Sequence, residues 1–118
     1  MNVESLLERL CARLGSPSAS DAGAVLVSVL AALSPLVPWP SLNRLGRELP
    51  PEWMSALRSE RFADDGGRGL FEARLRAVAV KDDDAATVLR ELSSHLDVRA
   101  RHALFVALPD DLRAVLAA

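Results

Sequence analysis

Ser94, His95 and Asp97 are the residues whose types come closest to catalytic chemistry in this sequence. A serine nucleophile, a histidine base and an orienting aspartate act together only when their side chains converge from a fixed geometry. Neighbours along one helix point in different directions, so this run predicts no triad. His102 is the other histidine, and an expected helix break at Asp97 separates it from His95. We therefore expect no catalytic residue and no metal site.

The glycines and the acidic runs also favour structural roles. Gly66, Gly67 and Gly69 follow acidic residues and lack the preceding strand that a phosphate-binding loop needs. Asp64–Asp65 and Asp82–Asp84 could hold a hard cation weakly, but turns and helix N-termini explain both runs more simply. The sequence thus predicts no cofactor, and we expect that the chain is not an enzyme.

Trp39 and a set of arginines are the candidate partner-binding residues. Pro38 and Pro40 hold the backbone at Trp39 extended and could present the indole ring to a partner. The alignment of Trp39 with Val98 in the repeat described below favours partial burial instead. Solvated helix faces or an acidic partner would each explain the arginines. The candidates are Trp39, Arg99, Arg101 and Arg113, and the same basic set contains Arg58 and Arg61.

The elements that position these residues follow a repeat. Residues 49–57 are matched by residues 108–116, and both segments begin with Leu-Pro. The same offset, applied further back, pairs apolar residues without a gap: Leu45 with Leu104, Leu33 with Leu92, Leu30 with Leu89 and Val29 with Val88. We therefore expect one helical unit in two copies.

Apolar residues at helical spacing, together with caps and prolines, predict the helices. No stretch alternates with the period of a strand. The fold prediction is all-α: about eight short helices in two pseudo-repeated four-helix halves that form one bundle. Residues 1–118 form a single domain, with internal repeats at about 1–62 and 69–118 and a linker at 63–68. The helices are expected at 3–14, from a cap at Ser18 or Ser20 to about 34, and at 40–49, 51–57, 70–78, 82–96, 97–108 and 109–116.

Charge and apolar runs exclude several classes of protein. The net charge of −2 disfavours a general nucleic-acid binder, which needs a basic face. Residues 22–43 carry no charge, but Pro35, Pro38 and Pro40 leave an apolar helix of about a dozen residues, whereas a membrane span needs about 20. We therefore expect a buried core helix and no membrane partner. The single cysteine, Cys11, excludes an internal disulfide and favours a reducing cytoplasm.

The chain resembles the bacterial domain-of-unknown-function family numbered 2267. The resemblance rests on the two turns at 49–53 and 108–112, which read Leu-Pro-x-x-[Leu/Trp], and on an opening helix that contains Leu6-Leu7-Glu8-Arg9-Leu10 and then Arg13-Leu14-Gly15. It implies two copies of a helical unit over nearly the whole chain. It implies no activity or catalytic residues, because the family carries none.

Together these patterns predict a non-enzymatic, cytoplasmic module for protein–protein interaction or scaffolding. A homo-oligomer is one form of this hypothesis, as in a death-fold-like adaptor that self-associates, although that fold usually has six helices. The alternative is a carrier that holds a small apolar ligand between the two halves. A cavity lined by Leu30, Leu89 and Phe105 would favour the carrier, whereas a solid core with an exposed apolar patch would favour the interaction module.

Overall fold

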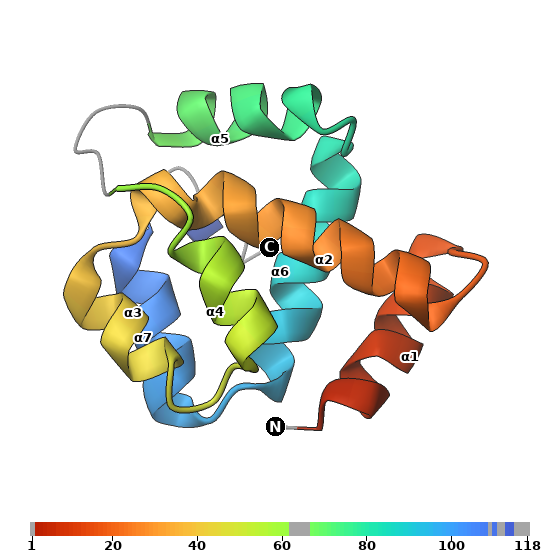
Figure 1. Cartoon of the computed structure of the whole chain (residues 1–118), viewed down its shortest axis with the longest axis horizontal. Coiled ribbons are helices and arrows are strands. Elements are labelled where there is room, and N and C mark those ends of the chain that lie inside the picture. Colours follow the sequence, from red (N-terminus) through yellow and green to blue (C-terminus); the bar gives the residue numbers. More distant parts are fainter. Residues whose placement is uncertain (1, 62–66, 109, 111–112, 115–118) are drawn as a thin grey trace.

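The computed structural model describes residues 2–61, 67–108, 110 and 113–114, and within these residues it is helical without a strand (Figure 1). The all-α prediction is therefore confirmed. The elements are α1 (Val3–Leu14), α2 (Ala19–Leu33), the 3₁₀ turn η1 (Ser34–Leu36), α3 (Trp39–Leu45), α4 (Pro51–Leu57), α5 (Gly67–Ala77), α6 (Asp82–His95) and α7 (Val98–Ala107).

The helix ends follow the chemistry expected from the sequence. Ser18 accepts a hydrogen bond from the amide of Asp21 at 3.2 Å and begins α2, and the carboxylate of Asp97 accepts from the amide of Ala100 at 2.7 Å and begins α7. Gly15 ends α1 in the left-handed region, with φ 67°, where glycine carries no Cβ penalty. These caps confirm the predicted boundaries at 18, 97 and 15.

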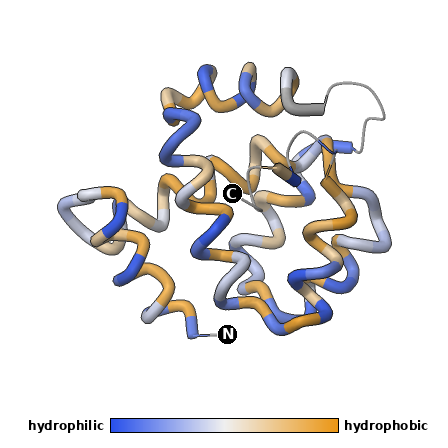
Figure 2. The backbone as a smooth tube through the Cα atoms, turned by 180° about the vertical axis from the view of Figure 1, so that it is seen from behind, coloured by the Kyte–Doolittle hydropathy of each residue, from blue (hydrophilic) through white to orange (hydrophobic). Residues whose placement is uncertain are grey.

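Helix α2 is the centre of the molecule. It packs against α1, α4, α5 and α6, and Figure 1 shows α5 lying along one side of it. Leu26, Val29, Leu30 and Leu33 have no exposed surface. The surrounding helices are amphipathic, and Figure 2 shows apolar and polar residues alternating along α1 and α5. The apolar faces of the outer helices therefore enclose the one helix that is apolar nearly all round.

Helix α2 and η1 together form an apolar segment longer than the sequence suggested. Pro35 does not end the helical path, because it lies in the 3₁₀ turn that continues α2 to Leu36. Ala19–Leu36 is thus long and apolar enough to cross a membrane by length and composition, and half of it is buried inside the fold. A core helix of this length meets the same criteria as a membrane span.

Helices α3 and α7 form an antiparallel pair beside α4. The amide of Asp97 at the start of α7 donates to Glu48 Oε2 at 3.1 Å, just beyond the end of α3. Figure 1 shows the two helices side by side. Helix α3 ends at Leu45, earlier than the predicted 49, because Gly46 begins a set of tight turns that lead to Pro50.

The residues that the repeat pairs have matching environments. Leu45 and Leu104 are both buried, as are Leu30 and Leu89. Trp39 and Val98 are both exposed, at 65% and 78%. This agreement is what a duplicated unit would give. That the two predicted repeats superpose on each other as copies of one helical unit stays a prediction.

Two boundaries of the predicted repeat differ from the structure or fall outside it. Helix α5 begins at Gly67, so residues 67–68 are helical and not part of the predicted linker 63–68. Residues 63–66 lie outside the described residues. The predicted eighth helix at 109–116 is described only at Asp110, Arg113 and Ala114, all of which are helical.

A buried carboxylate joins α1 to α6. The side chain of Glu91 is 7% exposed and pairs with Arg13, while Arg9 Nε lies 3.7 Å from Glu91 Oε2. Both arginines are more than half exposed. Glu91 Oε2 has no hydrogen-bond partner in the described part of the chain. The carboxylate therefore depends on these two arginines for compensation of its charge.

The paired leucines provide a test of the packing. Leu45→Ala and Leu104→Ala are each expected to lower the free energy of unfolding by about 2–5 kcal/mol, because both side chains are buried and truncation leaves a cavity. Val98→Ala, at the exposed repeat position, is the control and should stay within about 0.5 kcal/mol of the parent chain. Urea denaturation measures all three. Losses below about 0.5 kcal/mol for both leucines would contradict this packing.

The arginines and Glu91 should respond asymmetrically to removal. Arg9→Met with Arg13→Met strands a buried carboxylate and should cost about 3–5 kcal/mol. Glu91→Leu leaves two arginines that already face water and should be close to neutral or stabilising. Combining all three changes should restore most of the lost stability. Equal losses in the arginine double variant and the triple variant, measured by urea denaturation, would refute this dependence.

Candidate partner-binding surface

Trp39 is the most exposed large aromatic side chain among the described residues, at 65%. It is the first residue of α3, and Pro38 before it is extended, with φ −74° and ψ 160°. Pro40 occupies the first turn, where its missing amide hydrogen costs nothing. The two prolines hold the backbone on both sides of the indole ring, so the ring faces solvent from a fixed position.

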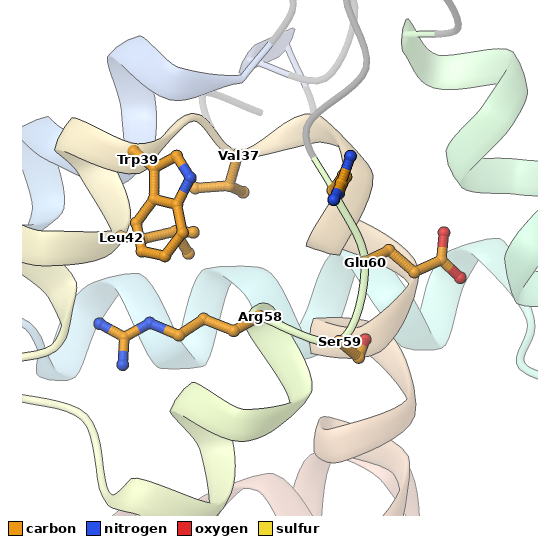
Figure 3. A pocket seen from close by; sticks show the side chains of 7 residues that line it. Val37, Trp39, Leu42, Arg58, Ser59 and Glu60 are labelled. Atoms are coloured by element: carbon orange, nitrogen blue, oxygen red, sulfur yellow. The ribbon is translucent and has the colours of Figure 1, made fainter.

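The ring borders a hollow of about 610 Å³ at the junction of α3 and the end of α4. Figure 3 shows the Trp39 ring above the extended side chain of Arg58, with Leu42 behind the ring and Glu60 farther along the wall. We call this site the Trp39 hollow. It is lined by Val37, Trp39, Leu42, Arg58, Ser59, Glu60 and Arg61.

The charge of the Trp39 hollow is positive. Arg58 and Arg61 are exposed, and neither forms a hydrogen bond or an ion pair with another described residue. The carboxylate of Glu60 is already paired with Arg74 of α5. Two guanidinium groups that have no partner among the described residues therefore line the hollow.

The wall that carries Glu60 is fixed to the core. The hydroxyl of buried Ser34 accepts from the amide of Glu60 at 2.8 Å and donates to the Glu60 carbonyl at 3.2 Å. This reciprocal contact ties the chain after α4 to the end of α2. Both walls of the hollow therefore belong to the fold: α3 forms one wall, and the anchored segment after α4 forms the other.

The end of α7 extends the apolar surface near Trp39. Because Glu48 joins the end of α3 to the start of α7, the antiparallel packing brings the start of α3 level with the last turn of α7. Phe105 and Val106 in that turn are 37% and 47% exposed. They are exposed apolar side chains at the same end of the α3–α7 pair as Trp39.

Arg101 and Arg113 perform a structural task that sequence reasoning did not identify. Arg101 Nε donates to the carbonyl of Ser93 at 3.0 Å, and its Nη2 donates to that of Leu96 at 3.2 Å. These acceptors lie eight and five residues before the arginine. Such carbonyls at a helix C-terminus have no partner within the helix, so Arg101 caps α6.

Arg113 caps the C-terminus of α7 in the same way, and two of its acceptors again lie eight and five residues before the arginine. Its Nε donates to the carbonyls of Phe105 at 3.1 Å and Leu108 at 2.9 Å, and Nη2 donates to that of Val106 at 3.1 Å. Its guanidinium also lies 5.8 Å from the centre of the Phe105 ring. Both helices end in an extended leucine, Leu96 or Leu108, with closely similar backbone angles. Two of the four predicted partner-binding residues are therefore helix caps.

Arg99 lies away from Trp39, at the opposite end of the α3–α7 pair. It lines a separate hollow of about 470 Å³ with Arg44, Arg47, Glu48 and Asp97. The amide of Ala100, and secondarily the side chain of Glu48, lower the pKa of Asp97 below its ordinary value. The structure does not bring Arg99 and Trp39 into one site.

The residues with catalytic side chains do not converge. Ser94 Oγ lies 3.2 Å from His95 Nδ1, but both groups are hydrogen-bonded to the carbonyl of Glu91, at 2.8 and 2.9 Å. The carboxylate of Asp97 is occupied by its helix cap. Among the described residues, no three histidine, cysteine, aspartate or glutamate side chains could hold a metal ion together. Cys11 is half-buried, and its thiol donates to the carbonyl of Ser16.

The cavity that would favour a carrier is not formed by its predicted residues. Leu30 and Leu89 are fully buried in the core, whereas Phe105 is 37% exposed on the α7 surface. A separate, mainly apolar hollow of about 760 Å³ lies between α1, α2 and the start of α4, and residues such as Leu7 and Val27 line it. No free cations border that hollow within the described residues, in contrast to the Trp39 hollow.

Comparisons of the chain with family models, with curated proteins and with solved structures gave no match. The resemblance to the bacterial family numbered 2267 therefore stays a proposal. The candidate surface rests on the residues of this chain alone.

Substitution separates a capping arginine from a solvated one. Arg101→Leu is expected to lower the free energy of unfolding by about 1–3 kcal/mol, because two carbonyls at the end of α6 lose a charged donor. Arg99→Leu, two residues away, should change it by less than about 0.5 kcal/mol. Urea denaturation of the two variants compares them directly. Unchanged stability of Arg101→Leu would return Arg101 to the partner-binding candidates.

Proposed function

We propose that this chain is a non-enzymatic, cytoplasmic protein-interaction module that binds its partner at the Trp39 hollow. The observation that carries the proposal is the exposed Trp39 ring, on a backbone held by two prolines, in one hollow with two arginines that have no partner among the described residues. Tryptophan and arginine are the residue types that most often dominate the binding energy of protein interfaces.

The energetics of Trp39 support this role. An indole ring carries a large apolar area, and leaving it in water forgoes the stabilisation that its burial would provide. Two prolines fix its backbone, so little conformational entropy would be lost when a partner covers it. Phe105 and Val106, in the last turn of α7, are further exposed apolar side chains of the α3–α7 pair.

The charges support a protein partner that carries carboxylates. Arg58 and Arg61 line the same hollow as the ring, and guanidinium groups bind carboxylates through paired hydrogen bonds. A nucleic acid is the weaker proposal, because the whole chain has a net charge of −2. The carrier alternative would have to use the hollow between α1, α2 and α4, whose polar groups are few.

Truncation of the ring tests the proposal. Trp39→Ala should leave the melting temperature nearly unchanged, because the side chain is mostly exposed, and should abolish capture of the partner from a lysate of the native host. Val98→Ala, the equivalent exposed position of the second copy, is the matched control and should leave capture intact. Differential scanning calorimetry and affinity capture with quantitative mass spectrometry provide the readouts. A large fall in melting temperature, or undiminished capture, would assign Trp39 to the fold instead.

A further inference from the structure

The connection between α5 and α6 carries the opposite charge to the Trp39 hollow. We call Val78 and Lys81 of this connection, together with Asp82–Asp84 in the first turn of α6, the acidic turn. Asp82 and Asp83 are exposed, and no side chain caps α6 at Lys81. The three aspartate carboxylates have no ion pair within the described part of the chain. Val78 is 48% exposed beside them.

The acidic turn and the Trp39 hollow lie on different sides of the molecule. Figure 1 places the connection between α5 and α6 on one side of α2 and the start of α3 on the other. The acidic turn of one molecule therefore cannot reach the Trp39 hollow of the same molecule. A second molecule can present the turn to the hollow without unfolding either element.

We propose that the occupant of the Trp39 hollow is the acidic turn of a second copy of this chain. This inference rests on the proposed function and names its partner. Three aspartates and Lys81 give the turn a net charge of −2, and Arg58 and Arg61 provide two positive charges that no described residue pairs. Asp82 and Asp83 pair with the two arginines, while Val78 covers the indole ring of Trp39.

The contact is head-to-tail, because it joins two different surfaces of the same chain. Each added molecule leaves one hollow and one acidic turn free, so the contact forms open chains, or a ring where the rotation closes. A surface made of one turn and one hollow is small, and small interfaces are weak and transient. Self-association should therefore rise with concentration and fall at high salt, which screens exposed charges.

Two complementary variants test the pairing. Arg58→Glu with Arg61→Glu blocks the hollow, and Asp82→Arg with Asp83→Arg blocks the acidic turn. Sedimentation equilibrium over a concentration series should show the parent chain growing beyond a dimer and each variant alone associating at least about tenfold more weakly. An equimolar mixture of the two variants should associate again, because the unchanged acidic turn of one fits the unchanged hollow of the other and the reversed turn meets a reversed hollow of opposite charge.

Matched controls separate this pairing from general charge effects. Glu4→Arg with Glu8→Arg reverses two exposed acids on α1, including one in its first turn, and should leave self-association unchanged. Circular dichroism checks that each variant folds. Where a reversal disturbs the fold, Arg58→Gln with Arg61→Gln and Asp82→Asn with Asp83→Asn replace it, and each should still weaken association.

The outcomes distinguish self-association at the Trp39 hollow from the proposed function, which is partner binding at that hollow. A parent chain that stays monomeric at every concentration, or a mixture of the two variants that stays monomeric, would overturn self-association. If Trp39→Ala still abolishes capture of a different protein in that case, the proposed function stands with another occupant. If capture is also unchanged, the proposed function fails as well.

Discussion

The enclosure of α2 is the constraint on which the rest of the structure depends. Its side chains are apolar nearly all round, and Leu26, Val29, Leu30 and Leu33 have no exposed surface. Such a helix gains stability only when other helices remove most of its faces from water. The outer helices α1, α4, α5 and α6 provide that cover. Glu91 adds a charged contact between α1 and α6, two of the helices that enclose α2.

The α3–α7 pair stands apart from this arrangement and carries the candidate surface. These two short helices pack mainly on each other, so both helix starts and the last turn of α7 face solvent. Extended corners at Pro38 and Leu96 set the entry into each helix. Arg101 caps the C-terminus of α6 at the Leu96 corner, and Arg113 caps that of α7 at Leu108. Trp39 is exposed at the first residue of α3, where Pro38 and Pro40 hold its backbone on both sides.

The helices could be predicted from the sequence because their signals are local. Serine and aspartate caps, Gly15 and the prolines at the first turns determine where helices begin and end. The burial of Leu45 and Leu104 followed from the repeat. The linker prediction extended too far, since Gly67 is already helical in spite of the low helix propensity of glycine.

The site was only partly predictable, because its roles depend on tertiary contacts. Trp39 was a candidate, but its exposure depends on how α3 meets α4 and α7. Arg101 and Arg113 resemble solvated charges in the sequence, and their capping role appears only when the chain turns back on the preceding helix. Glu91 carries no local signal of burial.

Native-state hydrogen exchange in detergent-free buffer tests the central place of α2 most directly. Amides of residues 26–33 should exchange only through global unfolding, while those of α3 should exchange sooner. Exchange of α2 through local opening, or a chain that folds only with detergent, would contradict the central place of α2.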